Sequence, residues 1–341
     1  MSAPTRRRTP DSRQLAALTA HRGLATWAER LVPLADFRAA AAAPGDRLHP
    51  AAREAARRRC RLPVPDATAV EGPFGKVAVF GGVYSNHLAL AALLEDAARR
   101  RVDAIYCLGD LGGFGPEPEK VWPLLLAGGV RSIQGNYEQS LAAGREDCNC
   151  GYTDPRDNHF AAISYDYTAR HCSPAFKRWM GELPARRRVL VGGRELLLVH
   201  GSPRQVNEFL FASTCPDAFL ELLADRHRCD ALLCTHTGLP WHRRLPSGRD
   251  AVNVGAIGRP ANDGRAEVWY ALLEARPAGS GGGPPGGLGV ELVPLRYDHQ
   301  AMAAGVRAAG LPEEFAATLL TGWWTTCLEI LPARERAASR F

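Results

Sequence analysis

Four side chains that can bind a metal ion each stand at the end of a short apolar stretch of this 341-residue chain. Asp110 and Asn136 follow the stretches 104–109 and 130–135, and His200 and His236 follow 196–199 and 231–235. Short apolar stretches bounded by glycine are typical of buried strands, and a polar group just past such a strand lies at the rim of the sheet. A carboxylate, an amide oxygen and two imidazoles suit Mn, Fe, Zn or Ni better than Ca or Mg. We therefore predict that these four residues bind one cation.

The segments between these residues indicate a mixed α/β core. Residues 76–80 and 267–273 have the apolar, β-branched and aromatic content of strands. A helix rich in Ala and Leu is expected after Asn86, another after 115–118, and further helices in the long insert between Asn136 and His200. His87 belongs to the first turn of its expected helix, with a role as a metal ligand as the less favoured alternative.

Five short motifs in this order resemble those of the calcineurin-like metallophosphoesterase superfamily. The matching stretches are Gly82-Val83-Tyr84-Ser85-Asn86, Gly109-Asp110-Leu111-Gly112-Gly113, Gly135-Asn136-Tyr137-Glu138, His200-Gly201 and Thr235-His236-Thr237-Gly238. The resemblance covers residues 75–275 and continues through 253–260. It implies an α/β fold, the four-layer α/β/β/α metallophosphoesterase sandwich, with helical N- and C-terminal extensions.

The resemblance also implies which metal ligands are kept. In the family two metal ions share the aspartate that corresponds to Asp110. One ion takes Asp110, Asn136, His200 and His236, and this set is complete. The other ion would need ligands at Gly82, Tyr84 and Gly238, where the sequence departs from the family. The chain therefore resembles a divergent subgroup that lacks the Asp-x-His motif, and a mononuclear site is expected.

Several further residues are candidates for contacts at this site. Tyr84 either rebuilds the second metal position as an oxygen ligand or, as we prefer, fills the vacated space and donates a hydrogen bond. Tyr137 replaces the family's catalytic histidine and is expected to hydrogen-bond a leaving group, although its ordinary pKa near ~10 makes it a poor general acid. Arg259 is expected to bind phosphate. The remaining candidates for second-site or substrate contacts are Asn86, Asp157 and Arg204, and the alternative for both arginines is a solvated surface charge.

The chain divides into four segments by composition. Residues 1–74 form a basic extension with 13 Arg and seven acidic residues, which accounts for the net charge of +6 of the whole chain. Helices are expected in it from Arg13 onward and over 51–59, and its arginine clusters could touch nucleic acid, although a solvated packing helix is favoured. Residues 75–275 form the core, 276–289 a Gly/Pro-rich linker or loop, and 290–341 a strand and helical extension. That last segment is expected to be helical around 322–327, with Trp323 and Trp324 packed against the body.

Nine cysteines are scattered along the chain, several of them inside apolar strands. Buried, reduced thiols in a cytoplasmic protein are the expectation, because no secretory signal and no apolar stretch of the ~20 residues that span a bilayer is visible. Cys148 and Cys150 are the exception, since a Cys-x-Cys pair in a polar loop could form a structural metal site with Cys172, His159 or His171.

The leading functional hypothesis is metal-dependent hydrolysis of a phosphomonoester or phosphodiester by metal-activated water. A phosphorylated small molecule or a nucleotide is the expected partner. The alternative is a catalytically silent protein of the same fold that binds a metal ion or a phosphorylated ligand as a sensor or scaffold. A site adapted to a reaction on another substrate class is the third possibility.

Overall fold

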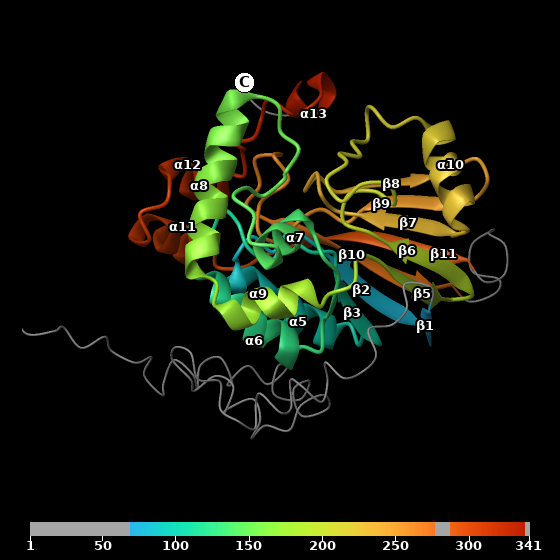
Figure 1. The fold of residues 1–341 in the computed structure, drawn as a ribbon. Coiled ribbons are helices and arrows are strands. Elements are labelled where there is room, and N and C mark those ends of the chain that lie inside the picture. Colours follow the sequence, from blue (N-terminus) through green and yellow to red (C-terminus); the bar gives the residue numbers. More distant parts are fainter. Residues whose placement is uncertain (1–68, 277–286, 338–341) are drawn as a thin grey trace, which may run out of the picture.

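Two stacked β-sheets with helices on their outer faces form the body of the protein (Figure 1). The computed structural model describes residues 69–276 and 287–337. One sheet has the order β11-β10-β2-β3-β4 and the other β1-β5-β6-β7-β9-β8. The strands of the first sheet are β2 (Lys76–Phe80), β3 (Ala104–Cys107), β4 (Arg131–Ser132), β10 (Val268–Ala275) and β11 (Leu288–Leu295). Those of the second are β1 (Val70–Phe74), β5 (Arg187–Val191), β6 (Arg194–Leu198), β7 (Ala231–Cys234), β8 (Trp241–Arg244) and β9 (Asp250–Asn253).

Along each central strand, successive side chains alternate between two cores. One core lies between the two sheets, and the other lies between a sheet and its helices. In β2, Val77 and Val79 enter the core between the sheets, whereas Ala78 and Phe80 face the helices. In β7, Leu233 enters the core between the sheets and Leu232 the outer core. Because successive side chains of a strand point to opposite faces, a fully apolar strand must be covered on both sides. The four-layer α/β/β/α sandwich expected from the sequence is therefore confirmed.

The helices cover the outer faces of both sheets. The five-stranded sheet is covered by α5 (His87–Arg99), α6 (Val121–Ala127), α7 (Asn136–Ala142), α8 (Pro155–His171) and α9 (Pro174–Gly181), with the short 3₁₀ helix η1 (Pro118–Lys120) before α6. The six-stranded sheet is covered by α10 (Asp217–His227). Polar caps begin several of them: Asn86 Oδ1 accepts a hydrogen bond from the amide of Ala89 at the start of α5, and Ser173 caps α9. His87 is the first residue of α5, as expected.

The C-terminal part returns to the core and then lies along α8 (Figure 1). β10 and β11 pair as antiparallel strands, and α11 (His299–Ala308), α12 (Glu313–Thr321) and α13 (Ala333–Ala337) follow. The expectation of a helix over 322–327 is wrong. Gly322 ends α12 in a left-handed conformation, with φ at +73°, and the chain continues as turns. Trp324 is buried as expected, and its indole N–H donates to the carbonyl of Pro260 at 2.6 Å.

Two expected segment boundaries change. Residues 70–74, assigned above to the basic extension, form β1, which pairs with β5 in parallel, so the sheet begins before residue 75. The strand expected to begin at residue 290 begins at Leu288. The helices expected in the extension and most of the Gly/Pro-rich linker, at 1–68 and 277–286, lie outside the described residues.

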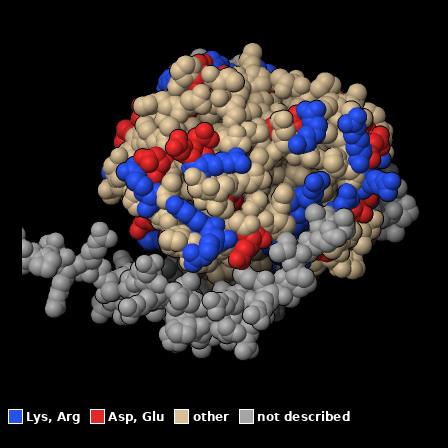
Figure 2. All heavy atoms as spheres, viewed as in Figure 1, with Lys and Arg blue, Asp and Glu red and all other residues tan. Residues whose placement is uncertain are grey.

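Charge on the body is mixed in sign. On the face seen in Figure 2, basic and acidic side chains are interspersed, in agreement with the balanced composition of the core. Within the part of the chain that the structure describes, no helix combines the length and the hydropathy needed to cross a membrane.

Candidate metal centre

The four predicted ligands lie together at one end of the two sheets. Asp110 follows β3 and Asn136 opens α7 just after β4, while His200 and His236 follow β6 and β7. The two histidine segments are joined directly, because the amide of His236 donates to the carbonyl of His200 at 3.0 Å. All four residues are buried, with His236 the most exposed at 8%. The fold thus brings together side chains from segments as far as 126 positions apart, from Asp110 to His236.

Four potential ligand atoms converge around His200 Nε2. It lies 3.0 Å from His236 Nδ1, 3.1 Å from Asn136 Oδ1 and 3.3 Å from Asp110 Oδ2. One ligand atom each from Asp110, His200 and His236 lie within 4.8 Å of one another, close enough to share an ion.

Main-chain carbonyls fix the orientation of three of these side chains. His200 Nδ1 lies 2.7 Å from the carbonyl of Leu108, and His236 Nε2 lies 3.1 Å from that of Cys150. Asn136 Nδ2 donates to the carbonyl of Cys148 at 2.8 Å. When each outer nitrogen donates to its carbonyl, the inner atoms of neutral histidines and of the amide carry lone pairs. Such hydrogen bonds behind a ligand orient it and select its tautomer in metal sites. The donor set therefore fits a cation, whose positive charge would offset the repulsion between the four converging acceptor atoms.

Among the groups of the site itself, only a proton can compete with a metal ion for the position beside His200 Nε2. Burial opposes charge on His200, but the carboxylate of Asp110 outweighs it and raises the pKa of His200. Burial and then the neighbouring His200 lower the pKa of His236 to about 3, so this ring stays neutral. Burial would raise the pKa of Asp110, but His200 holds it below its ordinary value. A proton on His200 and a metal ion would thus occupy the same place, and metal binding would release that proton.

Glu138 holds the two loops that carry Asp110 and Asn136 against each other. Its fully buried carboxylate accepts hydrogen bonds from the amides of Asp110 and Leu111, both at 2.8 Å, and from that of Gly135 at 2.7 Å. Burial and then the charge of Asp110 raise the pKa of Glu138 to about 7. Sequence reasoning quoted Glu138 within its motif but gave it no role. The sequence signal for this role is an acidic residue three positions after Gly135, at the start of a helix.

Comparison with known proteins identifies the family. Residues 76–276 match the model of the calcineurin-like phosphoesterase superfamily domain, which is more than half of the chain. The chain belongs to the calcineurin-like phosphoesterase superfamily. It is 26% identical to a metallophosphoesterase from Sphaerobacter thermophilus, over 73% of this chain and 99% of that one, with a TM-score of 0.54.

Two further similar proteins have no assigned function. A hypothetical protein from Pyrococcus horikoshii shares the fold with a TM-score of 0.60 at 22% identity, over 73% of this chain and 99% of that one. An uncharacterized protein of Methanocaldococcus jannaschii is 22% identical over 262 residues, which are 72% of this chain and 98% of that protein.

Side chains crowd Gly82, one of the positions where the family pattern has a ligand of a second metal ion, whereas Gly238 has room for a Cβ atom. A Cβ atom at Gly82 would lie 2.8 Å from Tyr84 Cζ, so the tyrosine ring occupies the space of the missing aspartate. A Cβ atom at Gly238 would lie 3.7 Å from the ring of Trp324. Both glycines have positive φ, at +52° and +68°, which disfavours the residues that the family uses there. Burial and the charge of Asp110 raise the pKa of Tyr84, which opposes a phenolate ligand. The structure thus favours a Tyr84 that fills the space over a rebuilt second metal site, but its hydroxyl does not donate the expected hydrogen bond to any described residue.

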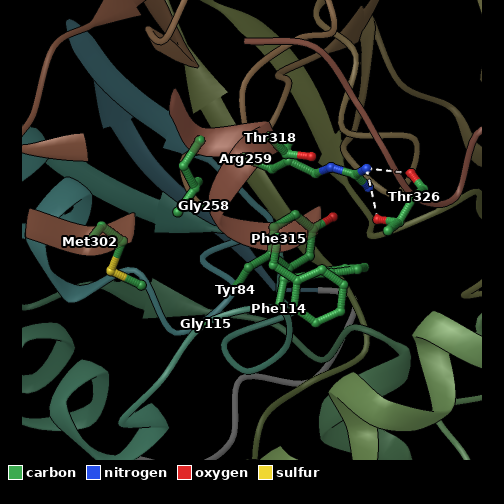
Figure 3. A pocket seen from close by; sticks show the side chains of 10 residues that line it. Tyr84, Phe114, Gly115, Gly258, Arg259, Met302, Phe315, Thr318 and Thr326 are labelled. Atoms are coloured by element: carbon green, nitrogen blue, oxygen red, sulfur yellow. Dashed lines mark hydrogen bonds between the residues drawn. The ribbon is translucent and has the colours of Figure 1, made fainter. Parts of the chain in front are cut away.

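Arg259 and Tyr84 line a narrow cleft beside the candidate metal centre. Both residues contribute to two adjoining cavities, of which one is also lined by His236 and Gly238. Figure 3 shows the guanidinium of Arg259 reaching the carbonyl and hydroxyl of Thr326, with Phe114 and Tyr84 nearby. In this conformation the cleft admits little more than a water molecule.

Four other candidates lie in different surroundings. The hydroxyl of Tyr137 is buried and lies 2.8 Å from Ser164 Oγ, so the expectation that it hydrogen-bonds a leaving group is not supported. Asn86 caps α5, and Asp157 accepts the amide of Ile330 at 2.9 Å, so it anchors the C-terminal segment and does not fold over the metal ligands. Arg204 is half-exposed and pairs with Glu208, as in the surface alternative considered above.

The Cys-x-Cys pair forms a disulfide, and not a metal site. Cys148 and Cys150 are bonded to each other, whereas Cys172 is a buried free thiol and His171 stacks on Tyr167. The structural metal site considered as a possibility for this pair is therefore not formed. The disulfide loop nevertheless matters to the candidate centre, because its carbonyl groups orient Asn136 and His236.

Proposed function

We propose that this protein is a metal-dependent phosphoesterase whose centre holds a single divalent transition-metal ion, of Mn, Fe, Zn or Ni. Asp110, Asn136, His200 and His236 would be its ligands. The observation that carries the proposal is the convergence of their four acceptor atoms. Main-chain carbonyls bind the outer nitrogens of His200, His236 and Asn136, so these nitrogens point away from the centre. The loss of space at Gly82 supports one ion and not two.

Hydrolysis of a phosphomonoester or phosphodiester is the reaction that this donor set favours. A divalent ion bound there would act as a Lewis acid toward a phosphoryl oxygen and toward water. Asp110 supplies the only negative charge among the four ligands, so the loaded centre would remain positive and attract an anionic substrate. Burial of the four ligands restricts bulk water and strengthens this attraction. A phosphorylated small molecule or a nucleotide is the substrate class we propose.

Turnover of generic substrates tests the reaction. The full-length protein is loaded in turn with Mn, Fe, Zn and Ni and incubated with an aryl phosphate and an aryl phosphodiester. We expect one metal at least to support turnover that Asp110→Ala abolishes and that Asp217→Ala, an exposed aspartate outside the centre, retains. Equal rates for the wild type and Asp110→Ala would exclude a catalytic role for this centre toward those substrates.

The position of Tyr137 favours a second candidate function. It replaces the histidine expected from the family motif, and its hydroxyl is held in the core by Ser164. A centre without that acid suits a catalytically silent protein that binds a metal ion or a phosphorylated ligand as a sensor or scaffold. In the same experiment, stoichiometric metal binding with no turnover above Asp110→Ala would favour this function.

Two broader proposals accompany the reaction. The buried free thiols of Cys107, Cys172 and Cys234 suit a reducing, cytoplasmic compartment, whereas the disulfide between Cys148 and Cys150 argues against one. Contact with nucleic acid through the arginine clusters of the extension stays a prediction, because those residues lie outside the described ranges.

A further inference from the structure

Arg259 is a buried cation without a carboxylate partner. Its side chain belongs to a residue that is only 6% exposed, and its guanidinium carbon lies 3.8 Å from the ring centroid of Trp324 and 5.2 Å from that of Phe114. Across residues 69–276 and 287–337, no Asp or Glu oxygen lies within 4.0 Å of it, unlike the many paired arginines of this chain. Aromatic faces stabilise a guanidinium in part, but a buried charge without a counter-charge remains costly.

Most of the donor groups of this guanidinium are available. Nη2 donates to the carbonyl of Thr326 at 2.5 Å and lies 3.3 Å from its hydroxyl. Nε and Nη1 donate no hydrogen bond within the part of the chain that the structure describes, where the hydrogen bonds of Arg259 come from Nη2 alone. The rings of Trp324 and Phe114 and the hydrogen bond to Thr326 therefore hold the fork in place, while Nε and Nη1 remain unpaired.

Tyr84 adds a second donor to the same cleft. Its ring packs edge-on against Phe114 at 5.2 Å, and its hydroxyl makes no hydrogen bond within the described part of the chain. Tyr84 and Arg259 line both adjoining cavities, and one of these cavities also reaches His236. Two hydrogen-bond donors, one of them charged, thus line a space that borders the candidate metal centre. That space is water-sized in this conformation, so an anion bound there requires the lining side chains to move apart.

We infer that Arg259 and Tyr84 form a phosphate-binding subsite, which takes the place of the second cation of the superfamily. A planar guanidinium fork with free donors suits two oxygens of a phosphoryl group, and a phenol hydroxyl suits a third. The inference rests on the proposed function for its choice of phosphate over other anions. The subsite binds the phosphoryl group, and the four metal ligands bind the adjacent cation.

The C-terminal segment builds this subsite. The main chain of Trp324 donates to Asn262 Oδ1 at 2.8 Å and its indole to the carbonyl of Pro260 at 2.6 Å, so the segment is tied to the loop that carries Arg259. Trp324 and Thr326 lie beyond the residues that match the family domain, which end at 276. Phosphate binding in this protein therefore depends on residues that the superfamily domain alone does not supply.

Binding of inorganic phosphate to the metal-free protein tests the subsite. The full-length chain is stripped with a chelator, and phosphate binding is measured by calorimetry for the wild type, Arg259→Gln, Tyr84→Phe and Arg265→Gln. Arg265 is the matched control, since it comes from the same loop, lies over Trp269 and pairs with Asp263. We expect Arg259→Gln to weaken binding by about 10-fold or more, as the loss of a charged hydrogen bond implies. Tyr84→Phe should weaken it severalfold, and Arg265→Gln should leave it unchanged.

Two further variants make the result decisive. Arg259→Lys keeps the buried charge but loses the planar fork, so it should fold and bind phosphate less tightly than the wild type. Arg307→Gln, at a surface arginine that pairs with Glu313, should bind phosphate as the wild type does. Undetectable phosphate binding by the metal-free wild type, or unchanged binding by a folded Arg259 variant, would overturn the inference. Neither outcome bears on metal-dependent turnover, so the two proposals can fail separately.

Discussion

His200 Nε2 lies 3.0 Å from His236 Nδ1, and the other nitrogen of each ring faces a main-chain carbonyl, of Leu108 and Cys150 respectively. When both rings are neutral and donate to these carbonyls, their lone pairs point toward each other. Such an arrangement is unfavourable unless a proton or a metal ion stands between the rings. With Asp110 and Asn136 beside them, a metal ion accounts for all four side chains at once.

Loss of one of these imidazoles should abolish tight metal binding. We predict that His236→Ala lowers the affinity for Zn or Mn by more than about 100-fold, because loss of a mere orienting partner already costs 10- to 100-fold. Equilibrium dialysis of the metal-free protein measures this. His242→Ala is the control, since that histidine pairs with Asp250 at the surface end of β8 and should bind metal as the wild type does. Similar losses in both variants would refute a specific role for His236.

Removal of the Glu138 carboxylate should loosen the loops around the centre. Glu138→Ala leaves three buried amides without their acceptor, and we expect the free energy of unfolding to fall by about 3 kcal/mol or more. Urea denaturation followed by circular dichroism gives the value. Replacement of the exposed Glu182 by Ala should change it by less than about 0.5 kcal/mol. A Glu138→Ala protein as stable as the wild type would show that these hydrogen bonds are not needed.

The two adjacent tryptophans should differ in their contribution to stability. Trp324 is buried against Arg259 and hydrogen-bonded to Pro260, so Trp324→Ala should lower the free energy of unfolding by about 3 to 5 kcal/mol. Trp323 is partly exposed, and Trp323→Ala should cost clearly less. Thermal unfolding of the two variants, measured side by side, checks the order. The reverse order would contradict the described course of the C-terminal segment.

Asp96 should give the protein a pH-dependent stability. Burial would raise the pKa of Asp96, but hydrogen bonds from Tyr270, Arg100 and Arg99 hold it below its ordinary value. Because the folded-state pKa lies below that of the unfolded chain, the contribution is complete above the unfolded-state pKa and is lost as pH falls through the folded-state pKa. We expect Asp96→Asn to be less stable than the wild type by about 1 kcal/mol at pH 7, with the difference vanishing at acid pH. A difference that is constant from pH 7 to pH 2 would be inconsistent with this.

Much of the fold and the grouping of the four candidate metal ligands could be predicted from sequence, because the strands follow local patterns and the ordered motifs resemble those of a known superfamily. Each ligand stands directly after an apolar strand, and the order of the motifs fixed their place in the sandwich. Alternation within β2 and β7 supplies two cores, and this follows from strand geometry alone.

The surroundings of the ligands depend on contacts between distant segments and could not be predicted in this way. Arg259 and Thr326 are 67 positions apart, and no pattern in either segment indicates that they meet. The ring of Tyr84 fills the space at Gly82 only because two successive residues, Tyr84 and Ser85, take positive φ. The helix expected over 322–327 does not form for a simpler reason, because Gly322 takes a left-handed conformation and ends α12 there.

Metal content per chain tests the mononuclear centre most directly. The purified full-length protein is saturated with Mn or Zn, freed of excess ion and analysed for metal and protein together, with Asp110→Ala treated in parallel. We predict one tightly bound ion per wild-type chain and none in Asp110→Ala. Two ions per chain, or an equal content in the variant, would contradict a single cation held by Asp110, Asn136, His200 and His236.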